Sequence, residues 1–465
     1  MNVFANGQSV DLMTVLNNKE WRSHYQESLK IQYPTAIIIS IKLNIPGPIK
    51  SSPLLKDSYH RGLRDIKHDL KQFETVHEQL FIERITGPEG FLVVLGDLKA
   101  VKLATISFEE KSIIGRLFDI DIMTEKDDQQ LSRRRLGYPA RTCLICDKDA
   151  KICIKQGAHT LESGYDAINK ICTIYMKKQI TIPKQSQNQL VQAAMTGLLY
   201  EVSLNPKPGL VDPVSNGAHS DMTVFTFIDS SLALQQYFNQ AYALAHDFSG
   251  DDLTVMFETL RQLGVHAEAE MFEATHDVNT HKGAIFSLGI LISAIAYGTR
   301  VSGVTVDDLQ KIITKMTAGL VQRDFKKLYE KKQKLTAGER QYQQYQLPGI
   351  RGEAAAGFPM VMDTALPFLL KSVGTTSQRL LDTLMKIAGS IVDTNLIKRA
   401  GSPDILKELN QWSTMYFSLG GSQTAAGITY LEKLDTEFVQ RHLSIGGTAD
   451  NLISTIFLAR LVGGI

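Results

Sequence analysis

Two aspartates one residue apart are the first feature of this sequence that could do chemistry. Asp119 and Asp121 lie in the segment Gly115–Met123, whose other members are mainly apolar. Alternate side chains of a β-strand share one face, so a strand here would project both carboxylates together. Such a pair, with substrate phosphates, suits Mg²⁺ and nucleotidyl transfer. The alternative is that one aspartate faces solvent and the other caps a turn.

A basic stretch follows. Residues 132–141 contain four arginines, three of them consecutive from Arg133 and the fourth at Arg141. Arginine forks match phosphate oxygens, so a basic loop near a magnesium-binding strand suits a polyphosphate substrate. The alternative is an ordinary solvated surface.

Four metal-ligand residue types come next. Cys143, Cys146, Cys153 and His159 are the residue types that bind zinc, although the spacing from Cys146 to His159 is not that of a common zinc finger. They predict either a structural zinc site or a group of small buried thiols. With Cys172 they place all four cysteines within thirty residues, which is not a secreted disulfide framework.

Polar motifs in the second half stand where apolar helical segments begin. The candidate site residues in them are Lys207, Asp212, Asn216, His219, Asp221, Asn279, His281, Lys282, Arg351, Glu353, Asp393, Asn395 and Asp450. Free backbone N–H groups at a helix start, beside a lysine and a histidine, would form a phosphate site. The alternatives are a helix cap for Asp221 and an ion pair at a helix start for Arg351 and Glu353.

The elements that must position these residues differ between the two halves. Residues 1–180 contain an amphipathic stretch at 8–29, a β-branched run at 35–41 and strand-like segments at 90–95 and 102–107. This predicts an α+β domain.

From residue 188 onward, apolar residues recur at three- and four-residue spacing, as in 190–199, 225–244 and 284–296. This predicts a mostly α-helical domain, 188–465. The polar segment 177–188 has the composition of a linker, and 326–346 that of an exposed helix.

Composition and charge limit the class of protein. At 465 residues two domains are expected, and 50 Lys+Arg against 49 Asp+Glu leave a net charge of +1. No overall field would attract nucleic acid or a membrane surface, so neither is expected as a partner. No run of 18 apolar residues and no signal-peptide pattern is present at the start, which predicts a cytoplasmic protein.

The N-terminal motifs together resemble the holo-acyl-carrier-protein synthase of citrate lyase, over about residues 15–175. The residues that carry the resemblance are Gly115-Arg116-Leu117-Phe118-Asp119-Ile120-Asp121, Ser132-Arg133, Leu136-Gly137-Tyr138-Pro139-x-Arg141-x-Cys143-Leu144-x-Cys146, Ala150, Cys153 and His159. The resemblance implies a nucleotidyltransferase-type domain that uses Mg²⁺. A serine of the lyase's acyl-carrier (gamma) subunit would attack the phosphorus next to the ribose of triphosphoribosyl-dephospho-CoA, and diphosphate would leave. Asp119 and Asp121 would hold the metal, while Arg116, Arg133 and Arg141 would offset the charge of the diphosphate.

The C-terminal motifs resemble the triphosphoribosyl-dephospho-CoA synthase family, over about residues 190–462. The segments that carry this resemblance are 206–212, 216–222, Asn279-Thr280-His281-Lys282-Gly283-Ala284-Ile285-Phe286-Ser287-Leu288-Gly289, 351–353, 393–395 and 446–450. It implies an enzyme in which the 2′-hydroxyl of 3′-dephospho-CoA attacks the ribose carbon of ATP that bears adenine, and adenine leaves.

This second resemblance also implies roles for the candidate residues. Phosphates would contact Lys207, His281, Lys282 and Arg351, and the substrates Asn216, His219, Asn279 and Asn395. Metal binding or acid–base work would fall to Asp212, Asp221, Glu353, Asp393 and Asp450.

Two positions depart from the synthase pattern. Lys398-Arg399-Ala400-Gly401 stands where the family usually has His-Arg-Gly-Gly, and Ile445 replaces a usual proline. A lysine would then serve in phosphate binding, or the second activity would be weakened.

The two implied reactions are consecutive, because the product of the second half is the substrate of the first. The alternatives are the related prosthetic-group pathway of malonate decarboxylase and a carrier-binding scaffold that has lost catalysis.

Overall fold

The computed structural model describes residues 2–125, 133–146, 148–326, 335 and 337–465. The chain divides into two compact units, Met1–Met176 and Lys177–Ile465, and each is described by itself. The polar segment predicted as a linker contains the end of helix α5, which runs to Gln179, and the short strand β5 at Thr181–Ile182.

The N-terminal unit is built on a four-stranded antiparallel sheet in the order β2-β3-β1-β4. Its elements are α1 (Leu12–Gln32), β1 (Ile37–Leu43), α2 (Pro53–Asp69), β2 (Glu74–Phe81), β3 (Glu89–Leu95), α3 (Leu98–Lys111), a 3₁₀ turn (Gly115–Leu117), β4 (Phe118–Met123), a second 3₁₀ turn (Arg133–Leu136), α4 (Ala150–Gln156) and α5 (Leu161–Gln179). The α+β prediction for this half is confirmed.

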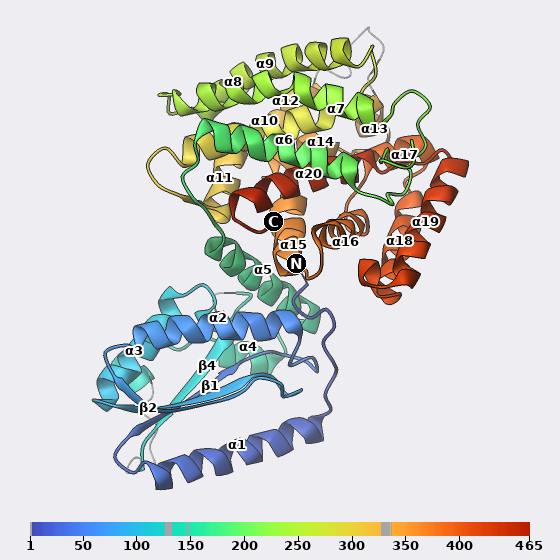
Figure 1. Ribbon diagram of the computed structural model, residues 1–465. Helices are drawn as coiled ribbons and strands as arrows, with labels where there is room; N and C mark the ends of the chain where they lie inside the picture. Colours follow the sequence, from blue (N-terminus) through green and yellow to red (C-terminus); the bar gives the residue numbers. More distant parts are fainter. Residues whose placement is uncertain (1, 126–132, 147, 327–334, 336) are drawn as a thin grey trace. The chain divides into compact units, whose positions relative to one another are not determined.

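Strand β1 is apolar on both sides because both faces of the sheet are covered. Ile37, Ile39 and Ile41 pack into a core shared with α2, α3 and α5. Ile38 lies on the opposite face, where Trp21 and other residues of α1 cover the sheet. Figure 1 shows α1 on one side of the sheet and α2 and α3 on the other. A strand buried on both faces reads as a continuous β-branched run, which is why the sequence located it.

One strand prediction is wrong. Residues 102–107 belong to α3, which begins after the cap Asp97. Val101, Thr105 and Phe108 are buried at helical spacing, and the six-residue window was too short to reveal this period. Strand β2 was missed because all of its side chains are exposed or half-buried and two of them, Glu74 and Glu78, are acidic.

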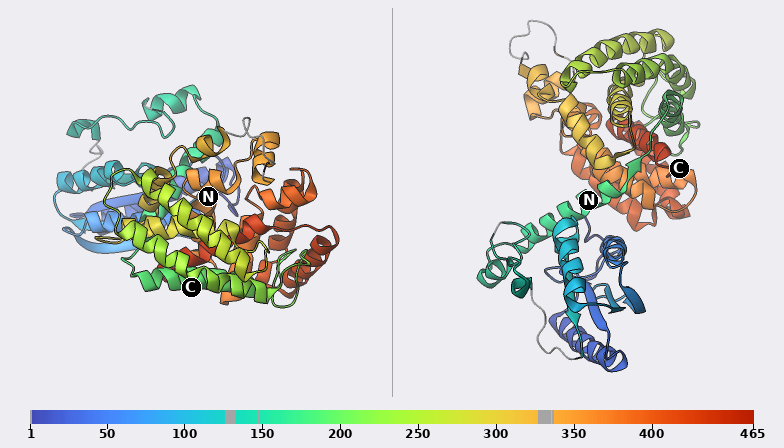
Figure 2. Two further views of the ribbon diagram at one scale, coloured as in Figure 1. Left: turned by 90° about the horizontal axis from the view of Figure 1, so that it is seen from above. Right: turned by 90° about the vertical axis from the view of Figure 1, so that its left-hand side faces the viewer.

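The C-terminal unit is almost wholly helical, with one two-stranded pair, β5 with β6 (Figure 2). Its elements are β5 (Thr181–Ile182), α6 (Gln187–Ser203), α7 (Val224–Ala233), α8 (Gln235–His246), α9 (Leu253–Ala274), α10 (Lys282–Gly298), β6 (Val304–Thr305), α11 (Val306–Met316), α12 (Leu320–Lys326), α13 (Ala337–Tyr345), α14 (Gly349–Ala355), a π-helical turn (Met360–Ala365), α15 (Leu366–Lys371), α16 (Thr376–Ala388), α17 (Thr394–Ala400), α18 (Ile405–Ser418), a 3₁₀ turn (Gly421–Gln423), α19 (Ala425–Gln440) and α20 (Gly446–Leu461).

Helices α10 and α20 form the centre of this unit. Most of their side chains are fully buried, and α10 packs on α8, α9, α11 and α20. The mainly helical prediction is confirmed, although the predicted helix 225–244 is two helices that meet at Leu234. In the segment predicted as an exposed helix, residues 327–334 and 336 lie outside the described residues, and α13 contains the buried Glu339 and Gln341. Within the described ranges, no helix is both long enough and apolar enough to cross a bilayer.

One glycine in α10 is explained by a close approach between helices. A Cβ at Gly289 would lie well inside van der Waals distance of the buried Tyr237 hydroxyl of α8. That hydroxyl donates to the Ile285 carbonyl at 3.2 Å and is held in place.

We expect Gly289→Ala to lower the free energy of unfolding of the helical unit by about 1–3 kcal/mol through overpacking. Urea unfolding followed by circular dichroism measures this. Gly264→Ala in α9 is the matched control, because its Cβ would lie 3.6 Å from the same hydroxyl, an ordinary contact. Equal stability of the two variants would contradict the expectation.

Candidate active sites

The two aspartates of β4 lie on one face of the sheet, as expected from the sequence. Phe118, Ile120 and Ile122 are buried on the other face, while Asp119 and Asp121 are half-buried. Both aspartates share the face covered elsewhere by α1. The two aspartates therefore lie on the part of this face that α1 leaves uncovered.

The two carboxylates differ in their partners. Asp119 pairs with the Lys42 ammonium and lies 3.7 Å from Arg141 Nη1. Burial opposes its ionisation, but Lys42 and Arg141 outweigh burial and lower its pKa. For Asp121, burial and the charge of Asp119 raise the pKa. Within the described residues Asp121 has no hydrogen bond or ion pair, so its carboxylate is available to a cation.

The predicted arginines lie close together but are engaged with groups of the protein, Arg133 and Arg141 with carboxylates and Arg116 with Thr142. Arg141 and Arg133 both pair with Glu109, and Arg116 donates to Thr142 Oγ1 at 2.9 Å. Burial lowers the pKa of Arg116, and the charges of Arg141 and Arg133 add to the effect. Of the three, Arg141 alone is recorded in an ion pair with an aspartate of β4.

Several polar residues of this site were not predicted. Lys42 lies directly across from Asp119 in the β1–β4 register, and Ser40 across from Asp121. Glu89 of β3 is buried and accepts two hydrogen bonds from Arg22 of α1 at 2.7 and 2.8 Å. The alternation of Ser40 and Lys42 with isoleucines in β1 was the available signal.

The structure brings the predicted zinc ligands together. The ligand atoms of Cys143, Cys146, Cys153 and His159 all lie within 4.8 Å of one another. In the described part of the chain this is the one group of three or more such residues close enough to hold an ion. Magnesium at Asp119 and Asp121, or elsewhere in the described chain, would therefore be bound by one or two carboxylates together with substrate oxygens.

The helical unit contains a cavity of about 860 Å³, within the range of about 300–1,000 Å³ typical of small-molecule sites. Eight of the predicted residues contribute to its wall: His219, Asp221, Asn279, His281, Lys282, Glu353, Asn395 and Asp450. They come from segments more than two hundred residues apart in the sequence. The cavity is therefore the feature that unites the C-terminal motifs.

Two long helices begin at the cavity wall. Lys282 and Gly283 open α10, Gly446 and Gly447 open α20, and neither N-cap residue, His281 or Ile445, makes a side-chain cap. Ala284 N and Thr448 N already donate to Asp450 and Asp393, so the N–H groups of the first two positions, with the helix dipoles, favour an anion in the cavity. Lys398, at the departure from the family pattern, also lines the wall. Within the described residues its ammonium has no ion pair or hydrogen bond.

Two carboxylates of the cavity have raised pKa values. Burial, followed by the charges of Asp393 and Glu201, raises the pKa of Asp450 to about 8, although the N–H of Ala284 donates to it. Burial raises the pKa of Glu353, whose Oε2 accepts from Met360 N at 3.2 Å. Asp450 is thus mainly protonated near neutral pH, which suits a proton donor.

His281 is held neutral with one ring nitrogen unpartnered. The side chain is 1% exposed, and burial together with the charge of Lys207 lowers its pKa to about 3. Its Nδ1 lies 2.7 Å from Ser230 Oγ, which accepts from Thr280 Oγ1. Ser230 can therefore donate to Nδ1, and Nε2 then carries the proton. Nε2 is buried without a partner among the described residues and would serve a ligand.

Four residues predicted to contact substrates or metal are instead engaged within the protein. Lys207 is fully buried, and its ammonium lies 2.5 Å from Glu201 Oε1 and 2.7 Å from the Glu201 carbonyl oxygen. Arg351 pairs with Asp324 at 2.7 Å. These cations are not among the residues that line the cavity, so their contact with phosphates stays a prediction.

The carboxylates of Asp212 and Asp393 are likewise occupied. Asp212 Oδ1 accepts from the N–H groups of Val214 and Ser215 at 2.8 Å, which closes the loop that contains Lys207. Asp393 caps α17 and accepts from Thr448 N at 2.8 Å. Both are at most 3% exposed. Asn216 is exposed and outside the cavity wall.

Comparison with known families follows the division of the chain. Residues 187–464 match the family described as ATP:dephospho-CoA triphosphoribosyl transferase, CitG. Residues 10–175 match the family described as apo-citrate lyase phosphoribosyl-dephospho-CoA transferase, CitX.

Three relatives illustrate the range of similarity. The chain is 53% identical over 467 residues to Protein CitXG of Leuconostoc mesenteroides subsp. cremoris, with 100% of both chains covered. It is 31% identical to Protein CitXG of Haemophilus influenzae, over 98% of this chain and 97% of that one. It is 52% identical to a probable 2-(5''-triphosphoribosyl)-3'-dephosphocoenzyme-A synthase of Lactiplantibacillus plantarum, over 58% of this chain and 95% of that one.

A sheet-based unit and a helical unit, each matching a transferase family, define a bifunctional transferase. The similarity to the two fused relatives extends along essentially the whole chain. The chain belongs to the CitXG family.

The burial of Lys207 allows a direct test of whether its role is structural or in phosphate binding. We expect Lys207→Ala to lower the free energy of unfolding of the helical unit by about 3–5 kcal/mol, because Glu201 would be left as an unpaired buried charge. Urea unfolding measures the loss. Lys207→Met combined with Glu201→Leu should recover most of it. Unchanged stability with a raised KM for ATP would instead favour phosphate binding.

Proposed function

We propose that this chain makes the prosthetic group of citrate lyase and attaches it to the lyase. The segment 188–465 joins ATP and 3′-dephospho-CoA into 2′-(5″-triphosphoribosyl)-3′-dephospho-CoA and releases adenine. The segment 1–180 transfers the phosphoribosyl-dephospho-CoA group to a serine of the acyl-carrier (gamma) subunit and releases diphosphate. The first reaction uses ATP and the second uses the product of the first. Because these are metabolites of the cytoplasm, we assign the enzyme to that compartment.

The observation that carries the proposal is the cavity of the helical unit. Motifs that are far apart in the sequence meet at its wall, and they supply two helix starts, cations and carboxylates with a raised pKa. The fusion of the two families supports consecutive reactions. The match of residues 10–175 to an apo-citrate lyase transferase favours citrate lyase over malonate decarboxylase. Lys398 on the wall supports a functional cavity over a scaffold that has lost catalysis.

In the adenine-releasing reaction, the 2′-hydroxyl of dephospho-CoA attacks the anomeric carbon of the ATP ribose. The bond to adenine breaks, the hydroxyl loses a proton and adenine gains one. Glu353, with its raised pKa, is placed as the base, and Asp450 as the acid. Asp221 is assigned to stabilise positive charge on the sugar or to hold Mg²⁺.

The triphosphate is assigned to the start of α10 and α20. Lys282, Lys398 and the neutral His281 would donate to its oxygens. Arg399 donates to His219 Nδ1 at 3.2 Å and would orient it, while Asn279 and Asn395 offer amides to the nucleotides.

In the attachment reaction, the carrier serine oxygen attacks the phosphorus next to the ribose, the bond to diphosphate breaks, and the hydroxyl proton is lost. Asp119 and Asp121 fit a Mg²⁺ ion, because they share a face and the Asp121 carboxylate has no hydrogen bond or ion pair with the described residues. The ion, when bound, would neutralise phosphate charge. We propose a nucleotidyltransferase-type active site here. Arg141 and Lys42 would turn from carboxylates toward diphosphate, with Arg116 and Arg133 behind them.

Single substitutions should separate the two reactions. With ATP, Mg²⁺, dephospho-CoA and the carrier subunit, we expect the wild-type chain to release adenine and add the prosthetic-group mass to the carrier. Asp121→Asn should still release adenine but slow attachment by about 100-fold or more. Glu353→Gln should release little adenine. Adenine chromatography and intact-mass spectrometry of the carrier measure both outcomes.

The intermediate provides the control. Purified triphosphoribosyl-dephospho-CoA should restore carrier modification by Glu353→Gln and should not restore it for Asp121→Asn. If Asp121→Asn modified the carrier at the wild-type rate, the metal assignment would be wrong. If the wild-type chain released no adenine, the scaffold alternative would replace the proposal.

The raised pKa of Asp450 predicts an upper pH limit for adenine release. A donor with a pKa of about 8 is protonated below that pH and loses its proton above it. Single-turnover adenine release should therefore fall above pH 8 by about tenfold per pH unit. Glu201→Gln should move this limit to lower pH, because the Glu201 charge helps raise the pKa. Glu432→Gln, an exposed change on α19, should leave the limit in place.

A further inference from the structure

The segment that follows the basic loop has almost no hydrophobic core of its own. Among the described residues from 133 to 160, Cys153 alone is buried. Three isoleucines of the segment are 39%, 50% and 77% exposed, at positions 145, 152 and 154. Apolar burial therefore cannot explain how this stretch keeps one conformation. Small folds without a core generally need a disulfide or a metal.

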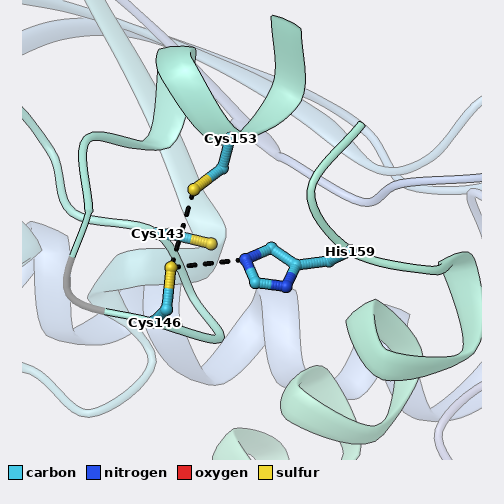
Figure 3. A group of neighbouring side chains, drawn as sticks. All are labelled: Cys143, Cys146, Cys153 and His159. Atoms are coloured by element: carbon cyan, nitrogen blue, oxygen red, sulfur yellow. Dashed lines mark hydrogen bonds between the residues drawn. The ribbon is translucent and has the colours of Figure 1, made fainter. Parts of the chain in front are cut away.

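Four ligand atoms meet inside this segment. Cys146 Sγ lies 3.6 Å from Cys153 Sγ and 3.3 Å from His159 Nε2, and Cys143 Sγ completes the group within 4.8 Å. Figure 3 shows Cys146 between Cys153 and the imidazole, with the Cys143 sulfur beside them. Tetrahedral zinc with bonds of about 2.3 Å to sulfur and 2.0–2.1 Å to nitrogen separates its donor atoms by about 3.6–3.8 Å. The two distances from Cys146 Sγ are within about 0.3 Å of these values, and the limit of 4.8 Å for the whole group is about 1 Å wider.

The backbone is shaped to present these ligands. A short antiparallel bridge joins Thr142 to Asp149, and Cys143 N donates to the Lys148 carbonyl at 2.7 Å. The turn between them holds Cys143 and Cys146, and Ile145 N donates to Cys143 Sγ at 3.4 Å. An amide that donates to a metal-bound thiolate orients it and offsets its charge.

We propose that Cys143, Cys146, Cys153 and His159 bind one structural Zn²⁺ ion. Three soft thiolates with one imidazole select zinc over magnesium or calcium. Four protein ligands fill a tetrahedral shell and leave no open position, so the ion has a structural role. A disulfide does not explain the set, because it would use two thiols and leave a third thiol and an imidazole beside it.

The ion would position the arginine of the attachment site. Arg141 stands two residues before the first ligand, and its carbonyl accepts from Ala150 N at 2.9 Å, next to the zinc loop. Its guanidinium donates to the Phe118 carbonyl at 3.2 Å and pairs with Glu109 and Asp119. Arg116 donates to Thr142, between Arg141 and Cys143. This link to catalysis rests on the proposed attachment activity, whereas the metal content does not.

Metal analysis of the purified full-length chain tests the site. We expect one zinc ion per chain to survive dialysis in a reducing buffer without chelator, and tetrahedral Co²⁺ absorption after exchange. Cys146→Ser and His159→Ala should weaken metal retention by about 10-fold or more. Cys172→Ala removes a buried thiol of α5 outside the group and should retain the ion.

Activity measurements distinguish the presence of a structural zinc ion from its role in positioning Arg141. Loss of zinc should slow attachment by about 100-fold, since small misplacements of a catalytic group have effects of that size. Adenine release, which is assigned to the helical unit, should remain at its wild-type rate, so that the loss is confined to the N-terminal unit. Arg141→Lys should keep its zinc and lose attachment. Removal of zinc from the wild-type chain by a chelator, followed by its return, should abolish and restore attachment.

Two outcomes would overturn the proposal. A wild-type chain without zinc, or with a Cys146–Cys153 disulfide under reducing conditions, would refute the metal site. Variants that lose zinc but attach the group at the wild-type rate would refute the positioning role. If the wild-type chain attached nothing, the metal content would still decide the zinc site.

Discussion

The carboxylate of Asp393 holds two helix starts together, and the shape of the helical cavity depends on this contact. One oxygen accepts from the first turn of α17 and the other from the backbone and hydroxyl of Thr448 in α20, all within 3.1 Å. Burial raises the pKa of Asp393, and these four donors oppose that effect. Gly447, which has no Cβ, allows the close approach. The positions of Asn395, Lys398 and Asp450 all follow from it.

The sequence predicted the elements whose pattern is local. The β-branched run of β1, the alternating aspartates of β4 and the long apolar segments of α6 and α10 carry their period within a few residues. The division into an α+β half and a helical half follows from the same periods. The motif starting at Asn279 also marked a helix start correctly, because polar residues that precede a buried helix can cap the helix or contact a ligand.

Which polar residues contact a ligand could not be predicted, because a motif does not distinguish a carboxylate facing a cavity from one that closes a loop. Asp212 and Asp221 belong to neighbouring motifs, yet the first is enclosed by backbone N–H groups and the second is exposed on the cavity wall. Lys207 was assigned to phosphate from the family resemblance, and its partner Glu201 could not be foreseen because it lies in the preceding helix, outside the motif. Lys42 was missed because its contact with Asp119 depends on strand register.

Several cations near the two sites are already paired in the structure, although Lys398 on the cavity wall has no partner among the described residues. Lys42 faces Asp119, Arg141 faces Glu109, and Lys282 lies 2.5 Å from Glu268. A phosphate that binds one of these three paired cations must displace a carboxylate, so binding there is an exchange of partners. Sites of this kind release few mobile counterions, and their affinity varies less with ionic strength than that of an open basic surface. Substrate affinity should then hold nearly constant as the salt concentration of the surroundings changes.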